Sequence, residues 1–152
     1  MSDTKPTNPK DRAASHRLDL SLFPATARAF GALGMTEGDC KYGGFNYRPS
    51  GVLASVYYAS TNRHLDAWFN GEYADPKTGV PHLASALAGI AIIIDAQVCG
   101  VLKDDRPPQA PVGPLIRDFE IKVKALHDLF PAGPARYTEQ KTDTPQSYGG
   151  TD

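Results

Sequence analysis

The stretch that decides the fold is PHLASALAGIAIIIDAQV, at positions 81–98. Pro81 suits the first turn of a helix, where its missing N–H would have no partner in any case. The rest of the segment is long, apolar and free of proline, so it predicts a helix from about Pro81 to Val98. Small side chains fill its first half and would let a second backbone approach closely: Ala84, Ser85, Ala86, Ala88, Gly89 and Ala91.

A second helix is predicted upstream, from about Gly51 to Phe69, with Ser50 as its N-terminal cap. Its side chains recur at three- and four-residue spacing, so that one face carries Leu53, Tyr57, Ser60, His64 and Trp68. The segment between the two helices, 70–81, contains two glycines and two prolines and therefore predicts a loop. Together these segments predict an antiparallel helical hairpin.

Further out, the alanine-rich segment from Pro24 to Leu33 predicts another helix. The glycine-rich stretch 34–51 predicts a loop. Residues 115–130 are ambiguous, because Phe119, Ile121 and Val123 alternate with charged residues as in a strand, while the wider apolar spacing fits a helix. We favour a helix, since no partner strand is evident elsewhere. The predicted fold class is an all-α helical bundle.

Three regions are expected along the chain. Residues 1–17 form a polar N-terminal arm and residues 18–130 a single helical domain, in which four prolines between positions 104 and 114 make a stiff connector. Residues 131–152 are rich in proline, glycine and threonine and are predicted to be a disordered tail.

Composition excludes several classes of protein. The 152 residues suffice for one domain, and the net charge of -1 disfavours direct nucleic-acid binding, which needs a basic surplus. No apolar run could span a bilayer, and the polar start has no apolar signal core, so no membrane association or secretion is expected. Two cysteines are too few for a disulfide framework or zinc ribbon, which favours a cytoplasmic protein.

The richest chemistry lies around the hairpin loop. An antiparallel hairpin brings His64, Glu72, Asp75 and His82 toward one end, with Arg63 beside them. Histidines and carboxylates bind divalent cations, and a bound cation can activate water against a phosphate ester. The same residues also fit plainer roles: an acidic turn, a core histidine bonded to a carbonyl, and ordinary surface charges.

A second candidate site is the stretch from Glu37 to Arg48. Its glycines expose backbone N–H groups and Lys41 adds positive charge, so that it could hold a phosphate chain. Tyr42 and its aromatic neighbours offer flat surfaces on which a nucleobase can stack. The spacing is not that of a P-loop, and a plain solvent-exposed loop fits it as well.

Six short motifs then occur in a characteristic order: Asn8-Pro9-Lys10-Asp11, Leu20-Ser21-Leu22-Phe23-Pro24, Lys41-Tyr42-Gly43-x-x-Asn46-Tyr47-Arg48, Arg63-His64-x-x-Ala67, Gly71-Glu72-x-x-Asp75 and Thr78-Gly79-x-x-His82-Leu83-Ala84. In this order they resemble phage-encoded dATP/dGTP diphosphohydrolases, which are related to the MazG-like, all-α nucleotide pyrophosphohydrolases. The resemblance covers about residues 8 to 98.

The resemblance implies an enzyme that converts dGTP or dATP to the monophosphate and pyrophosphate, in the host cytoplasm, as a homodimer or homotetramer. It implies Mg²⁺ or Mn²⁺, with Co²⁺ as a possible substitute, as the cofactor. In phages whose DNA carries 2-aminoadenine, this reaction would support synthesis of that base. Its implied metal ligands are Glu37, Glu72 and Asp75.

Further roles follow from the same resemblance. His64 and His82 would act with Glu72 and Asp75 in catalysis. The implied substrate contacts are Asn8, Lys10, Lys41, Tyr42, Asn46 and Arg63. The chain departs from the general MazG pattern, since it lacks helical E-x-x-E or E-x-x-D motifs and has Ser85 where many relatives have a histidine.

Two alternatives stay open. One is an HD-type phosphohydrolase, for which His127-Asp128 supplies the dipeptide and His64 an upstream histidine. The other is a helical module that binds a nucleotide or partner without turning it over.

Overall fold

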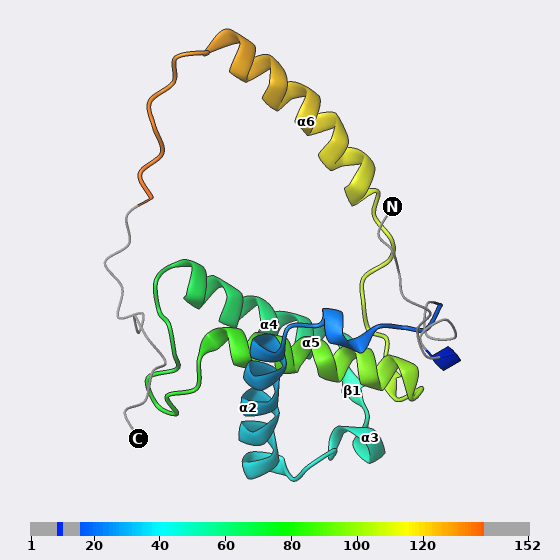
Figure 1. Cartoon of the computed structure of the whole chain (residues 1–152). Helices are drawn as coiled ribbons and strands as arrows, with labels where there is room; N and C mark the ends of the chain where they lie inside the picture. The colour runs from blue at the N-terminus through cyan, green and yellow to red at the C-terminus, as the bar shows by residue number, and fades with distance from the viewer. Residues whose placement is uncertain (1–8, 11–15, 139–152) are drawn as a thin grey trace.

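The all-α prediction is confirmed in the computed structural model, which describes residues 9–10 and 16–138 (Figure 1). The elements are, in order, η1 (Leu20–Leu22), α2 (Ala25–Tyr42), α3 (Tyr47–Ser50), β1 (Val52–Leu53), α4 (Ala54–Phe69), α5 (His82–Val98), β2 (Leu102–Lys103) and α6 (Val112–Leu129). In the described residues the one sheet is the parallel pair β1–β2, with Val52 opposite Leu102.

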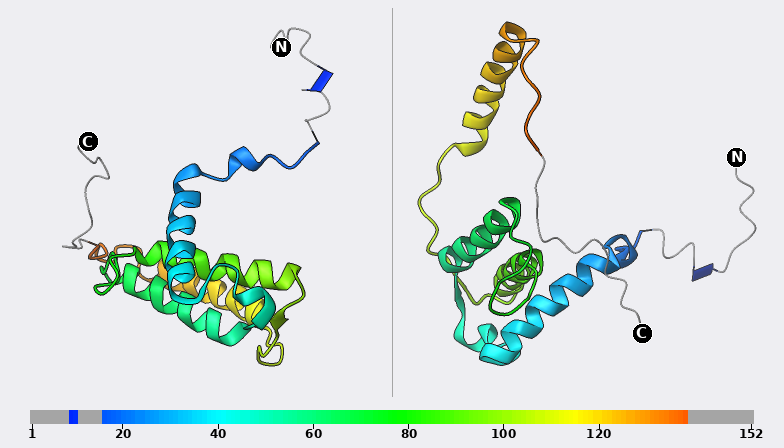
Figure 2. Two further views of the ribbon diagram at one scale, coloured as in Figure 1. Left: turned by 90° about the horizontal axis from the view of Figure 1, so that it is seen from below. Right: turned by 90° about the vertical axis from the view of Figure 1, so that its left-hand side faces the viewer.

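Helix α5 is the centre of the bundle. It packs against α4 as the predicted hairpin, and α2 crosses the hairpin steeply (Figures 1 and 2). Small side chains make both contacts close. A Cβ added to Gly34 of α2 would overlap the carbonyl of Ala84, and one added to Gly89 would lie 2.5 Å from Thr61 Oγ1 on α4. The small residues of α5 therefore serve the close approach that their sequence predicted.

A second packing centre lies where α3, β1 and the end of α5 meet. Tyr47, Val52 and Ala96 are buried there. Arg48 forms a bidentate ion pair with Asp95 of α5, with Nε–Oδ2 and Nη2–Oδ1 distances of 2.9 and 3.0 Å. Because Arg48 is held in this way, it anchors α3 to α5 and is not available as a phosphate ligand in this conformation.

The predicted loop at 34–51 is wrong in its first half. Helix α2 continues through Gly34 and Gly38 to Tyr42, and the chain turns only at Gly43, whose φ is 86°. Gly34 is a site of helix crossing, so the glycine that suggested a break in fact permits α2 to pack on α5.

The predicted Ser50 cap is also wrong. The Ser50 hydroxyl donates to the carbonyl of Asn46, and α4 begins at Ala54. The first turn of α4 is instead capped from a distance, because the Asp105 carboxylate accepts hydrogen bonds from the backbone N–H and hydroxyl of Ser55. These bonds lower the pKa of Asp105.

Helix α6 confirms the helical interpretation of 115–130 and begins three residues earlier. It stands away from the bundle at the end of the proline-rich connector (Figures 1 and 2). Residues 131–138 are exposed and have no helix or strand, while 139–152 of the predicted tail, and most of the predicted N-terminal arm, lie outside the described residues. None of the described helices combines the length and apolarity needed to cross a membrane.

Candidate functional site

A chain of three hydrogen-bonded side chains occupies the closed end of the α4–α5 hairpin. His64 of α4 and His82, the first residue of α5, approach with Nδ1 atoms 2.9 Å apart. His82 Nε2 lies 2.7 Å from Glu72 Oε1 in the intervening loop. His82 is buried, whereas the Glu72 side chain is 55% exposed. The residues His64, Glu72 and His82, here called the polar cluster, therefore meet as the hairpin predicted.

The partners in the polar cluster assign its protons. The Glu72 carboxylate only accepts, so His82 donates through Nε2–H, and a neutral His82 then accepts at Nδ1. His64 must in turn donate from Nδ1, which leaves the lone pair of its Nε2 available. Burial lowers the pKa of His64, and the neighbouring His82 lowers it further. His64 is thus a neutral imidazole near pH 7, with one nitrogen free to take a proton.

Asp75 stabilises the loop between α4 and α5. Its Oδ1 accepts the backbone N–H groups of Lys77 and Thr78, at 2.8 and 3.0 Å, and these bonds lower its pKa. The turn they close is pinned further by the bond from His82 N to Tyr73 O. In this structure Asp75 therefore has the simpler of its two predicted roles, as the residue that stabilises an acidic turn through Oδ1.

Glu37 and Lys41 bring α2 to the same region. They form an i, i+4 ion pair with an Nζ–Oε1 distance of 2.6 Å, which raises the pKa of Lys41. The charges of Glu37 and Asp75 both oppose the lowering of the His64 pKa, so these carboxylates lie within electrostatic range of the imidazole. Three carboxylates and two histidines thus share one end of the bundle.

These side chains are not arranged as a metal centre in this conformation. The described residues contain no group of three or more histidines, cysteines or carboxylates positioned to hold an ion. Glu72 is bonded to His82, Asp75 closes its turn, and Glu37 is paired with Lys41. The predicted ligand set of Glu37, Glu72 and Asp75 would have to exchange these partners to bind a cation, and metal use stays a prediction.

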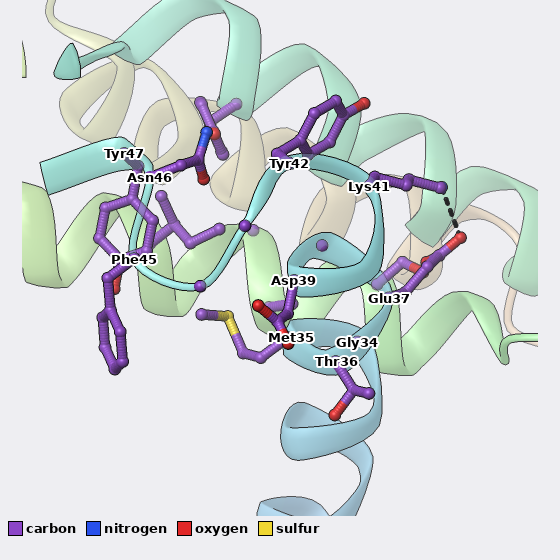
Figure 3. Close-up of a pocket in the computed structure, with 18 of the residues that line it drawn as sticks. Gly34, Met35, Thr36, Glu37, Asp39, Lys41, Tyr42, Phe45, Asn46 and Tyr47 are labelled. Carbon is purple, nitrogen blue, oxygen red and sulfur yellow. Dashed lines mark hydrogen bonds and ion pairs between the residues drawn. The ribbon is translucent and has the colours of Figure 1, made fainter. Parts of the chain in front are cut away.

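A cavity of about 500 Å³ lies between α2, the 43–47 turn, α4 and α5 (Figure 3). Its walls combine aromatic, apolar and polar side chains, among them Met35, Glu37, Asp39, Lys41, Tyr42, Phe45, Asn46, Tyr57, Ser60, Ser85 and Ile92. Glu37 belongs to this wall and its charge also acts on His64, while Lys41 belongs to it and acts on Asp75 of the hairpin loop. Among the described residues that line the cavity, none belongs to the polar cluster itself.

The predicted substrate residues divide into two groups. Lys41, Tyr42 and Asn46 line the cavity. Arg63 is exposed on α4 and Lys10 is exposed near the N-terminus, and neither lines it. Asn8 lies outside the described residues.

Several cavity residues were not predicted as site residues. Tyr57 and Ser60 lie on the α4 face whose spacing was recognised, but His64 was the one residue of that face proposed for the site. Ser85 was noted as a small residue of the helix and as a departure from a family pattern. Asp39 could not be placed because the sequence predicted a loop where α2 continues. Burial raises the pKa of Tyr57, as expected for a phenol in the cavity wall.

The described elements thus form an all-α bundle with histidines and carboxylates at the closed end of its hairpin, and with an aromatic-lined cavity between α2, α4 and α5. Residues 7–106 match the family described as dATP/dGTP diphosphohydrolase, N-terminal. The chain belongs to the dATP/dGTP diphosphohydrolase family. No curated protein and no solved structure matches the chain. The matched region ends before α6.

Proposed function

We propose that this protein hydrolyses the purine deoxynucleoside triphosphates dGTP and dATP to the monophosphate and pyrophosphate. The observation that carries the proposal is the 500 Å³ cavity, whose wall includes Glu37 within electrostatic range of His64, in a chain of this family. A cavity of this size is in the usual range for a small-molecule site. The base would lie against Tyr42 and Tyr57, and the phosphates would extend toward Lys41.

In the proposed mechanism, His64 is the general base. Its free Nε2 takes a proton from the water that attacks the α-phosphorus, and pyrophosphate leaves with the electron pair of the broken P–O bond. The positive charge that develops on His64 is stabilised through His82 by the Glu72 carboxylate, in the manner of an oriented histidine–carboxylate pair. Lys41 would exchange Glu37 for a phosphate oxygen.

A divalent cation, Mg²⁺ or Mn²⁺, is part of the proposal because a triphosphate carries a large negative charge that Lys41 alone does not balance. The available carboxylates are Glu37 and Asp75, once released from their present partners, while Glu72 keeps its bond to His82 in this mechanism. Such a cation would neutralise the phosphates and polarise the reacting phosphorus.

Asp39 is the proposed discriminator between purines. It lines the cavity, and in the described part of the chain its carboxylate has no hydrogen-bond or ion-pair partner. Guanine presents two adjacent donors, N1–H and the 2-amino group, which a carboxylate can accept together, whereas adenine presents a single donor group on that edge. Asp39 would therefore favour dGTP over dATP.

The biological role proposed for this activity is support of 2-aminoadenine DNA synthesis in a phage-infected cell. Hydrolysis of dGTP would supply the purine monophosphate for the modified base, and hydrolysis of dATP would suppress ordinary adenine.

The test is product analysis. Purified protein is incubated with each deoxynucleoside triphosphate, in Mg²⁺, Mn²⁺ or EDTA, and the products are separated by ion exchange. We expect monophosphate and pyrophosphate from dGTP and dATP, loss of turnover in EDTA, and a large loss in Glu72→Gln. Asp66→Asn is the matched control, because Asp66 is an exposed acidic residue of α4 outside the cluster.

The alternatives predict other results. Turnover with any product pattern other than pyrophosphate release, such as intact triphosphate, would favour an HD-type enzyme. That enzyme would need the His127-Asp128 dipeptide near His64, but α6, which carries the dipeptide, stands away from α4, which carries His64 (Figure 1). Binding of nucleotide without turnover in any metal would instead identify a binding module.

A further inference from the structure

Helix α6 carries a continuous apolar stripe that nothing in the described chain covers. The stripe consists of Val112, Ile116, Phe119, Val123, Leu126 and Phe130, each between 49% and 65% exposed. At 3.6 residues per turn the five stripe positions from Val112 to Leu126 lie within one narrow sector of α6, and Phe130 follows directly after its last residue, Leu129. No residue of α6 is buried, and α6 has no appreciable packing against the described bundle (Figure 1). A single stripe of this length on a solvent-exposed helix requires a partner surface.

The connector holds α6 off its own bundle. Its first residues are fixed, because Asp105 caps α4 through Ser55 and Asp104 forms a bidentate pair with Arg106. That pair lowers the pKa of Asp104 to about 2. Three prolines follow, at 107, 108 and 111, and each has a restricted φ angle. The chain therefore leaves the bundle in a set direction.

The spacing of the stripe identifies the partner. Successive stripe residues are separated by four, three, four, three and four positions. The order of these spacings is the same from either end of the helix. An identical helix packed antiparallel therefore places its stripe residues level with those of the first helix. The layers would be Phe119 on Val123 of the partner subunit, Ile116 on Leu126 of the partner subunit, and Val112 on Phe130 of the partner subunit. A self-complementary patch of this kind is what a two-fold symmetric interface needs.

We propose that α6 is the dimerisation element of this protein, and that two copies of the chain pair through antiparallel α6 helices. Burial of the stripe would remove on the order of 600 Å² from each copy, or about 1,200 Å² in total, at the lower edge of stable interfaces. Because the family match ends at residue 106, this interface lies outside the matched region.

The test is the mass of the full chain in solution, by sedimentation equilibrium over a range of concentrations. Phe119→Asp places a charge in the centre of the stripe. Ile121→Asp is the matched control, because Ile121 is 70% exposed and lies about 180° around the helix from the stripe. Circular dichroism of both variants checks that α6 remains helical.

We expect the wild type and Ile121→Asp to have twice the chain mass of 16.4 kDa, or four times if a second interface is present. Phe119→Asp should halve that mass and weaken pairing at least about 100-fold, because a buried unpaired charge is costly. A monomeric wild type, as when α6 folds back on its own bundle, overturns the proposal, and so does a Phe119→Asp variant with unchanged mass.

Orientation is tested by disulfide trapping. In a chain with Cys40 and Cys99 replaced by serine, Phe119→Cys and Val123→Cys variants are mixed and oxidised. The antiparallel pair should cross-link the two variants to each other far more than either to itself. Preferential self-linking of Phe119→Cys would mean parallel helices and would refute the proposed register.

Discussion

At the scale of single residues, the chemistry of the site depends on which nitrogen carries which proton. His64 and His82 cannot both present N–H at their shared 2.9 Å contact, and Glu72 decides between them by accepting from His82. One acceptor in the loop therefore sets the tautomer of a histidine two side chains away.

The pH dependence of turnover follows from this arrangement. Protonation of His64 removes the proposed base, and its pKa is lowered below the ordinary 6.5 by burial and by His82. The acidic limb of kcat/KM for dGTP should consequently lie below pH 6.5. His64→Gln should lower kcat by about 10²–10⁴. A limb clearly above pH 6.5, or a fully active His64→Gln, would contradict the assignment.

The same pKa shift affects stability, with a definite sign. The unfolded chain binds a proton at His64 more readily than the native chain does, so the free energy of unfolding should fall as the pH is lowered from about 6.5. Comparison of urea unfolding for the wild type and His64→Gln between pH 5 and 7.5 isolates this contribution, since the variant lacks the titrating group. Equal pH dependence in both would show that His64 does not contribute.

Asp39 is the residue expected to distinguish guanine from adenine. Asp39→Asn replaces an acceptor-only carboxylate with an amide of similar shape, so that one oxygen acceptor for guanine is lost. We expect kcat/KM for dGTP to fall by about 10- to 100-fold while that for dATP changes little, a loss of the size of a charged hydrogen bond. Competition between the two nucleotides in one assay measures the ratio directly. An unchanged ratio would remove Asp39 from base recognition.

At the scale of secondary structure, glycine has opposite consequences at two points of α2. Gly34 is buried where α2 crosses α5, and an added Cβ would overlap the carbonyl of Ala84 and lie 2.9 Å from Ala88 Cβ. At Gly38, one turn later, an added Cβ would meet nothing within 4 Å. Close packing of α2 on α5 requires that Gly34 has no side chain, whereas Gly38 only lowers the stability of the helix.

Alanine substitution separates these two effects. Gly38→Ala should raise the free energy of unfolding by about 0.5–1 kcal/mol, because alanine favours the helix. Gly34→Ala should lower it by about 1–3 kcal/mol, because the crossing must open to admit the methyl group. Chemical denaturation of the two variants measures both changes in the free energy of unfolding. A Gly34→Ala variant at least as stable as Gly38→Ala would show that the helix crossing is loose.

At the scale of the whole molecule, the protein consists of a bundle that carries the site and a helix that stands apart from it. The family match ends at residue 106, near the start of the connector, and the bundle buries its small core without α6. The two parts therefore have separate roles in stability.

Removal of α6 tests that separation. A chain that ends at residue 111 should remain folded, because α6 contributes no buried residue to the bundle. Its thermal midpoint should not depend on concentration, whereas that of the full chain should rise with concentration, as mass action requires of a dimer. Differential scanning calorimetry at several concentrations measures both. Collapse of the helical signal in the short chain would mean that the bundle depends on α6.

Sequence alone determined the hairpin of α4 and α5, its loop, and the meeting of His64, Glu72 and His82. The signals for these features are the spacing of apolar residues and the positions of proline and glycine, which act over a few residues. It also identified the helical character of 115–130, although not the uncovered face. Only the tertiary structure decided that α2 runs on through Gly34, that Asp105 caps α4, that Arg48 pairs with Asp95, and that Asp39 faces a cavity. Each of these depends on a contact with an element far away in the sequence. The spacing of residues within one segment does not determine where such an element lies.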